Sequence, residues 1–383
     1  MFEISWKRAL TLVLLMASIE GCGVRAQPRV GRQEAPLALQ FQILWTHDFA
    51  LEQGFWGAET QEFGGPVETS NGLIVFGNRR GDIFALSKAD GTIAWTVDIG
   101  EPFVSEPLVV NDTLYLGSAS GLLYALDPRN GRKIWEFDTG ASIEARVSVE
   151  GATLVAANAL NRVYALNAKT GEFKWRKERS KVNDFTMFGH ASPTLHEGVV
   201  YAGFSDGWLM AYALEDGATV WGRDLSKGNA RFRDIDAAPL VVGDALFVAS
   251  FAGGLYRLEL ATGEVVWHRE LEGVGELSES DGVLYFASRD GVHATDSFYG
   301  EDNWVAPLNA FDIACGPEPG ARNLYVGLKN EGLLVLDRQT GQRVALIDSG
   351  SGFSAPPLLV DNRLFLFSND SMFYAYSVDD RPL

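Results

Sequence analysis

The sequence predicts an all-β protein: an eight-bladed β-propeller of four-stranded antiparallel blades, with the ring closed by an N-terminal strand. Three observations predict it. Tryptophans recur about every 40 residues, short apolar runs alternate with tight-turn residues, and a strand-like segment near the N-terminus supplies what the last copy lacks. Self-similarity at this period indicates stacked supersecondary units.

The clearest repeat is a tryptophan four residues after a glycine, first seen as Gly91 and Trp95. Successive tryptophans of this kind are 40, 40, 46, 46 and 37 residues apart, and a seventh copy at 341–345 keeps the glycine but has Ala345 in place of the indole. We expect each indole on an outer strand, packed against the next blade with its N–H bonded to a turn. The six tryptophans are Trp95, Trp135, Trp175, Trp221, Trp267 and Trp304.

One copy, residues 106–138, contains four runs rich in Val, Leu, Tyr and Trp, separated by Asn-Asp, Ala-Ser-Gly and Asn-Gly. Such runs and turns predict strands joined by hairpins, and four strands per copy of about 40 residues describe a propeller blade. The mature chain shows no helical apolar stripe. The second strand of each copy gives eight blades: 73–76, 113–116, 153–156, 199–202, 245–249, 283–287, 323–327 and 363–367.

The eighth copy ends at residues 379–383, before an outer strand. Residues 43–48, Ile-Leu-Trp-Thr-His-Asp, align without a gap on the outer strand 93–98 and share its Ile, Trp, Thr and Asp. We therefore expect this segment to complete blade eight. Closure removes the open edges that a linear array would expose to aggregation.

Composition is consistent with one large domain. The chain has 383 residues, and we assign 1–21 to a signal peptide, 22–38 to a flexible tether and 39–383 to the propeller. The net charge of −18 argues against nucleic acid as a partner and against adsorption to anionic membrane surfaces, because both require clustered Lys and Arg.

The N-terminus resembles an export signal, with Lys7 and Arg8 before a short apolar run. Residues 19–22, Ile-Glu-Gly-Cys, are similar to a lipoprotein cleavage site that would leave Cys22 lipidated, although Glu20 fits that site poorly. Cleavage after Ala26 by an ordinary signal peptidase is the alternative. Both place the domain outside the cytoplasm. The other cysteine, Cys315, is expected to be a small buried hydrophobe, so no disulfide is predicted.

Three connections from an outer strand to the next inner strand are long. From tryptophan to the next turn they take 23 residues (175–198), 22 residues (221–243) and 26 residues (45–71), against 15 to 19 elsewhere. Such connections emerge on one face of a propeller, and the first two are neighbours. Insertions gathered on one face indicate a binding surface.

The contents of the two neighbouring loops suit a partner protein. The first offers Phe185, Met187 and Phe188, whose alternative is to fold back onto blade four. The second carries Arg233, Asp234 and Asp236, a candidate charged rim around an apolar anchor. We take these six residues as the candidate partner-binding site.

No residue pattern indicates catalysis or a cofactor, and we predict no catalytic residue and no metal. The five histidines are scattered, and no nucleophile elbow or phosphate-binding glycine loop is present. Asp234 and Asp236 could share a side of an extended segment like a carboxylate pair, but Arg231 and Arg233 are close enough to neutralise them.

Residues 125–135, Ala-Leu-Asp-Pro-Arg-Asn-Gly-Arg-Lys-Ile-Trp, resemble the tryptophan-docking repeat of quinoprotein-type propellers. Within that superfamily the mature chain resembles the BamB family, lipoproteins of the bacterial outer-membrane β-barrel assembly machine. The resemblance implies a non-enzymatic scaffold on the periplasmic side of the outer membrane, lipid-anchored through Cys22. Gly23 agrees with that location, because inner-membrane retention is associated with an aspartate there.

Two segments indicate which partner the resemblance implies. Residues 185–193 are similar to the family segment that contacts the central barrel subunit BamA, and residues 233–239 are similar to the paired-aspartate segment of the same interface. The resemblance implies that the periplasmic domains of BamA are the partner, with unfolded outer-membrane proteins as a second class. Phe188 stands where the family has an arginine, which puts the family ion pair there in doubt.

Two rival functions remain open. A quinone-dependent dehydrogenase has a similar repeat, but it is expected to be longer, to hold calcium at the ring centre and often to carry adjacent cysteines. A propeller of the same fold that binds another periplasmic protein is the second alternative.

Overall fold

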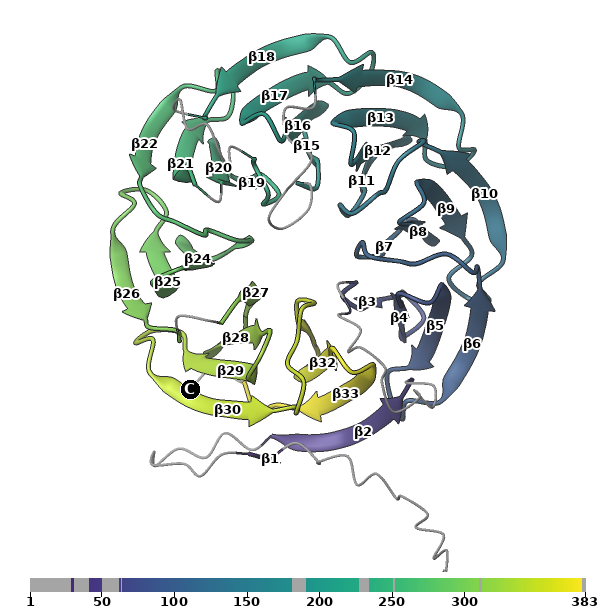
Figure 1. The fold of residues 1–383 in the computed structure, drawn as a ribbon, viewed down its shortest axis with the longest axis vertical. Helices are drawn as coiled ribbons and strands as arrows, with labels where there is room; N and C mark the ends of the chain where they lie inside the picture. The colour runs from purple at the N-terminus through teal and green to yellow at the C-terminus, as the bar shows by residue number, and fades with distance from the viewer. Residues whose placement is uncertain are drawn as a thin grey trace, which may run out of the picture.

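The protein is an eight-bladed β-propeller whose blades stand around a central axis (Figure 1). The computed structural model describes residues 29–30, 41–49, 62, 64–180, 191–226, 234–250, 252–309 and 312–380. Within these ranges the regular structure consists of β-strands, and no helix is long and apolar enough to cross a bilayer. The predicted fold class is confirmed.

Each blade is an antiparallel sheet whose strands run outward from the axis in four positions. The innermost strands are β3 (Val67–Glu68), β7 (Leu108–Val110), β11 (Ser148–Glu150), β15 (Thr194–His196), β19 (Leu240–Val242), β23 (Leu277–Ser280), β27 (Ala314–Pro319) and β31 (Leu358–Val360). The second strands are β4 (Leu73–Gly77), β8 (Thr113–Gly117), β12 (Thr153–Asn158), β16 (Val199–Gly203), β20 (Ala245–Ser250), β24 (Val283–Ser288), β28 (Asn323–Leu328) and β32 (Arg363–Phe367).

The third strands are β5 (Asp82–Ser87), β9 (Leu122–Leu126), β13 (Arg162–Asn167), β17 (Trp208–Ala213), β21 (Gly254–Glu259), β25 (Gly291–Asp296), β29 (Gly332–Asp337) and β33 (Met372–Ser377). The outer strands are β6 (Ile93–Asp98), β10 (Lys133–Asp138), β14 (Phe173–Glu178), β18 (Thr219–Asp224), β22 (Val265–Arg269), β26 (Asp302–Ala306), β30 (Arg343–Asp348) and β2 (Gln42–Asp48). In addition β1 (Arg29–Val30) pairs antiparallel with the outer edge of β30.

The apolar core is divided among the seams between neighbouring blades. Eight clusters of buried side chains are present in the described residues, and each draws on two adjacent blades. Second strands are therefore buried on both faces: Ile74, Val75 and Phe76 are all fully enclosed. This explains why these strands are continuous apolar runs rather than alternating ones.

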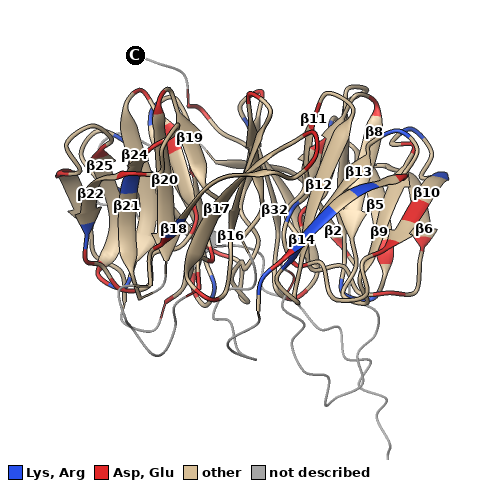
Figure 2. Ribbon diagram, turned by 90° about the horizontal axis from the view of Figure 1, so that it is seen from above, with Lys and Arg blue, Asp and Glu red and all other residues tan. Residues whose placement is uncertain are grey.

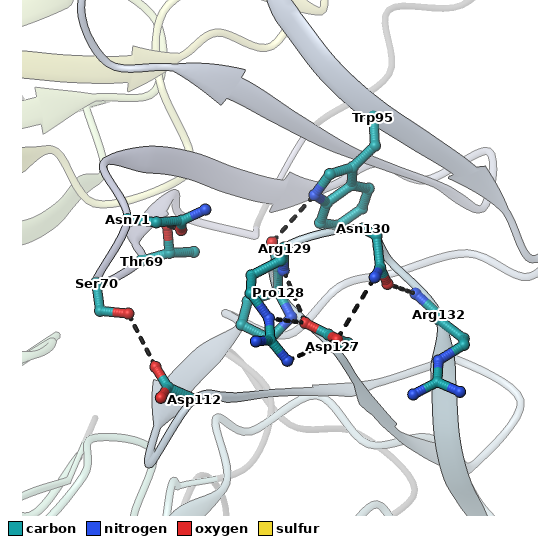
Figure 3. A network of polar contacts seen from close by, with 10 residues as sticks. All are labelled: Thr69, Ser70, Asn71, Trp95, Asp112, Asp127, Pro128, Arg129, Asn130 and Arg132. Carbon is teal, nitrogen blue, oxygen red and sulfur yellow. Dashed lines mark hydrogen bonds and ion pairs between the residues drawn. The ribbon is translucent and has the colours of Figure 1, made fainter.

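The tryptophans hold each seam at its outer margin. Trp95 donates its indole N–H to the carbonyl of Pro128 over 3.0 Å, and Gly131 of that next blade has φ of +70° (Figure 3). A Cβ on Gly131 would lie 2.8 Å from Cε3 of the indole, so the turn needs glycine for both conformation and space. The other five repeat tryptophans make the same bond, to Ala168, Leu214, Leu260, Phe298 and Arg338.

The turn that receives each indole is locked locally. In Figure 3, Asp127 accepts the backbone N–H of Arg129 over 3.0 Å and pairs with its guanidinium over 2.8 Å. Ser70 of blade one donates to Asp112 of blade two over 2.9 Å in the same view. The turn chemistry seen in the sequence thus fixes where neighbouring blades meet.

The N-terminal strand closes the ring as predicted. β2 pairs with β33 and supplies the outer strand of blade eight, with Trp45 opposite Ala375. Figure 1 shows β2 beside β33, on the outside of the ring. The ladder leaves no unpaired edge on β33.

Blade seven lacks its tryptophan because blade eight has no turn to receive one. The outer strand of blade eight comes from the N-terminus, so no hairpin of the Gly91 or Gly131 type follows β33. Ala345 replaces the indole, and the ring of Phe41 packs at this seam instead, 6.4 Å from Tyr325 and 6.2 Å from Tyr376.

The two faces of the ring differ. The hairpin face carries the turns between third and outer strands and the C-terminal end of the chain, which is uppermost in Figure 2. The connection face carries the links from each outer strand to the next inner strand and the turns between second and third strands. By their place in the sequence, the predicted binding loops belong to two of these links, from β14 to β15 and from β18 to β19.

Candidate functional site

Only some of the candidate partner-binding residues can be placed, and these lie on the connection face. Phe185, Met187, Phe188 and Arg233 lie outside the described residues, as does Cys22. The links that carry the candidates run from β14 to β15 and from β18 to β19. Asp234 and Asp236 are described, directly before β19.

The segment holding the aspartates is fixed to blade four by the residue between them. Ile235 donates its backbone N–H to the carbonyl of Phe204 over 3.3 Å, and its buried side chain fills the space beside Gly203, where a Cβ would collide with it. The same device recurs at other seams, where Ile143 lies beside Gly117 and Phe103 beside Gly77. The repeat architecture therefore determines the position of the aspartates.

Asp234 and Asp236 are enclosed rather than exposed on a rim. The exposed fraction of Asp234 is 2%, and both carboxylate oxygens of Asp236 are shielded from solvent. Burial raises the pKa of Asp236 well above its ordinary value, and the neighbouring Asp234 carboxyl raises it further. The charged rim expected from the sequence is therefore not formed by these two carboxyls, because docking of Ile235 on blade four encloses them.

Charged side chains next to the innermost strands were not singled out from the sequence. Arg146 lies 3.9 Å from Glu106 across the seam between blades two and three. Enclosure by the ring raises the pKa of Glu276 to about 7, with Glu106 as a further cause, and raises the pKa of Glu318 to about 7. In the described residues, no group of three or more His, Cys, Asp or Glu side chains is arranged to hold a metal ion.

Blade six contains a Ser-His-Asp chain whose serine and histidine are buried. Ser288 Oγ lies 2.8 Å from His293 Nε2, and His293 Nδ1 lies 3.3 Å from Asp302 Oδ2. Arg269 holds both oxygens of Asp302, at 2.6 and 2.7 Å. Ser288 and His293 are 7% and 3% exposed, so a substrate carbonyl has no approach to the hydroxyl, and the chain serves packing rather than nucleophilic attack.

Cys315 is half-buried in β27 and makes weak hydrogen bonds from Sγ to the carbonyls of Gly327 (3.4 Å) and Phe353 (3.1 Å). Burial raises the pKa of this thiol, and Glu276 raises it further. A thiol in this environment is a poor nucleophile, which agrees with the expectation from sequence.

Comparison with known proteins identifies relatives along most of the chain. The family model described as outer membrane protein assembly factor BamB matches residues 42–148 and 80–306, which together exceed half of the 383 residues. The outer membrane protein assembly factor BamB of Escherichia coli K12 is 27% identical over 360 residues, covering 92% of this chain and 81% of the relative. The Pseudomonas aeruginosa protein of the same name is 26% identical over 207 residues, covering 52% and 54%.

Solved structures share the fold. BamB from Moraxella catarrhalis superposes with a TM-score of 0.76 at 22% identity, covering 88% of this chain and all of that one. Quinohemoprotein alcohol dehydrogenase from Comamonas testosteroni superposes with a TM-score of 0.69 at 14% identity, covering 90% and 77%. At these identities the superpositions establish the propeller fold for both an assembly factor and an enzyme, so fold alone does not choose between them.

Proposed function

The chain belongs to the outer membrane protein assembly factor BamB family, and from this membership we propose that it is a non-enzymatic scaffold in the assembly of outer-membrane β-barrel proteins. Relatives of that name align with most of the chain. The observation that carries the proposal is that two of the three long connections, 175–198 and 221–243, are neighbours on one face of the ring.

The partner in this proposal is the periplasmic part of BamA, bound through the connections after blades three and four. Phe185, Met187 and Phe188 would supply apolar anchors, and Arg233 a charged contact. Asp234 and Asp236 would act from beneath the surface, because their carboxyls are enclosed against blade four. Unfolded outer-membrane proteins are proposed as a second class of partner.

The proposed location is the periplasmic side of the outer membrane, with a lipid on Cys22. The supporting feature is the short apolar leader that ends in a cysteine. Wild-type protein should then partition into detergent, and Cys22→Ser should not, because an acidic body has no affinity of its own for anionic membranes. A mass spectrum with an unmodified N-terminus at Gln27 would contradict this anchor.

The non-enzymatic part of the proposal rests on the names of the relatives and on the buried state of the Ser-His-Asp chain. The alternative function is that of a quinone-dependent dehydrogenase, an enzyme class that shares this fold. Adding pyrroloquinoline quinone and calcium to the purified protein should produce no bound chromophore and no alcohol oxidation. A stoichiometric chromophore would favour the rival.

The deciding experiment is a binding titration between the full chain and the purified periplasmic part of BamA. Phe185→Ala and Met187→Ala should each weaken binding by about 1–3 kcal/mol. Asp234→Ala and Asp236→Ala should weaken it with little salt dependence, since a desolvated group is poorly screened. Tyr299→Ala, an exposed aromatic on the hairpin face, is the matched control that should bind normally.

Two results would count against the proposal. Normal affinity in all four variants would mean that the surface is wrong. Failure of the wild-type chain to bind would mean that the partner is wrong, and would favour a propeller that serves another periplasmic protein.

A further inference from the structure

Arg179 breaks the repeat at the seam between blades three and four. The residue after an outer strand donates its backbone N–H to the turn between second and third strands, and Arg179 does so to Asn161 over 3.1 Å. Four other blades make the same bond with an uncharged residue in this place. These residues are Phe49, Ile99, Thr139 and Leu225. The repeat therefore does not require a charged side chain at this position.

The side chain of Arg179 reaches across the seam to blade four. Its Nε lies 2.8 Å from Oδ2 of Asp206, and its guanidinium carbon lies 4.5 Å from the ring centre of Trp208. Trp208 is itself an exception, because the other described tryptophans all lie on outer strands. Arg179, Asp206 and Trp208 are each partly exposed, so this stack forms part of the protein surface.

The stack continues onto blade three through a rigid contact. Asn161 Nδ2 donates to Ser205 Oγ over 2.6 Å, and Ser205 returns its backbone N–H to Asn161 Oδ1 over 3.1 Å. These two hydrogen bonds join the turns of the two blades, and Leu160, which directly precedes Asn161 in the blade-three turn, is 37% exposed. We call Leu160, Arg179, Asp206 and Trp208 the seam cluster.

The seam cluster adjoins the candidate site. Its blade-four turn begins at Phe204, whose carbonyl holds Ile235 between the two candidate aspartates. The guanidinium carbon of Arg179 also lies 5.9 Å from the ring centre of Phe204. One turn of blade four thus joins the seam cluster and the Asp234–Asp236 segment on a single face.

The chemistry of the cluster defines what it can hold. Leu160 and the indole of Trp208 offer apolar contact, and Arg179 is held in place by Asp206 beneath it. Nε of Arg179 donates to Asp206 and Nη1 to the sulfur of Met210, whereas Nη2 has no hydrogen-bond partner within the described residues and can donate to an acceptor from outside. Tryptophan and arginine, held rigid and partly desolvated, are the residue types that dominate affinity at protein interfaces.

We propose that the seam cluster is a further contact surface for the periplasmic BamA domains, receiving an extended segment in which an apolar side chain lies next to a carboxylate. The apolar side chain would rest on Leu160 and Trp208, and the carboxylate would accept from Arg179. This inference rests on the proposed function, because it names additional contacts for the same partner.

The test is a titration of the full chain with the periplasmic part of BamA, using variants of three residues of the seam cluster. Leu160→Glu places an acid beside the expected carboxylate and should weaken binding about 10-fold or more, whereas Leu160→Lys should retain or strengthen it. Trp208→Phe should cost roughly 5-fold, and Arg179→Lys should lose the planar stack and cost a similar factor.

Controls separate this inference from the proposed function. Tyr299→Ala, on the opposite face, should bind as wild type does, and thermal unfolding should show that each variant remains folded. If the wild-type chain binds and Leu160→Glu binds equally well, the inference is overturned while the proposed function stands. Equal losses of affinity for Leu160→Glu and Leu160→Lys would mean that the partner segment carries no carboxylate at this place. Failure of the wild-type chain to bind would overturn the proposed function and the inference together.

Discussion

The indole of Trp45 lies directly against Gly91, so that a Cβ on Gly91 would stand 2.5 Å from Cδ2 of the ring. Trp45 belongs to the strand that enters blade eight from the N-terminus, and Gly91 belongs to blade one. The contact therefore seals the ring where the chain begins and ends. The indole N–H of Trp45 is buried without a hydrogen-bond partner in the described residues, unlike the indole N–H of the other repeat tryptophans. At the same seam, Arg363 donates to the Lys88 carbonyl over 2.7 Å.

Gly91→Ala should destabilise the ring by about 2–4 kcal/mol, because the new methyl group meets the indole and the residue has φ of +74°. Gly72→Ala is the matched control, since Gly72 has φ of +76° but open space around its Cβ position. It should cost only about 1–2 kcal/mol, from the backbone alone. Urea unfolding measures both, and equal costs would mean that the indole contact contributes nothing.

Asp380 should stabilise the protein by fixing the C-terminal segment to blade seven. It is 2% exposed and accepts from the backbone N–H groups of Ala321, Arg322 and Asn323, and from the Asn323 side chain. Asp380→Ala leaves these buried donors without an acceptor and should lower the free energy of unfolding by about 2–3 kcal/mol. Asp380→Asn should lower the free energy of unfolding by less than Asp380→Ala does. Thermal unfolding measures both variants, and an Asp380→Ala protein as stable as wild type would contradict this role of Asp380.

Asp236 should make the protein less stable as pH rises. Its folded pKa lies above that of the unfolded chain, so between the unfolded value of about 4 and the folded value the folded state binds more protons. Stability contributed by the protonated carboxyl is present at acid pH and is lost as pH rises through this window. Asp236→Asn should remove the slope and be more stable than wild type at pH 7, and parallel stability curves for both proteins would contradict this.

His293 should give the opposite slope in a different window. Burial lowers its pKa below the ordinary value, although Asp302 acts to raise it. The folded state therefore resists protonation, and stability falls as pH drops below about 6.5, where the unfolded histidine takes up a proton. His293→Gln should flatten the pH dependence of urea unfolding between pH 7 and pH 5. An unchanged slope would mean that His293 is charged in the folded protein.

Most of the fold could be predicted because a repeat supplies its own internal comparison. The glycine–tryptophan spacing located the outer strands, and the alignment of residues 43–48 on 93–98 identified the closing strand, which β2 confirms. The absence of an indole at Ala345 could be read from the sequence. Its reason follows from the docking of each indole on the hairpin of the next blade, a hairpin that blade eight lacks.

The site was less accessible to sequence reasoning. The order of charges around Asp234 and Asp236 is consistent with a rim, and their burial follows only from the docking of Ile235 on blade four. The seam cluster was missed because Arg179 and Trp208 are 29 residues apart in sequence and meet only across a seam. Aligning the fourth residue after each repeat tryptophan would have shown Arg179 as the charged exception.

Pairing of β2 with β33 also sets when the protein can finish folding. The two strands are separated by more than 300 residues, so the first strand of the ring waits for the last one made. Contacts this distant in sequence form late and slowly. A chain that emerges N-terminus first therefore carries an unpaired, apolar strand through most of its synthesis, and that strand is an aggregation hazard until the C-terminal blade arrives.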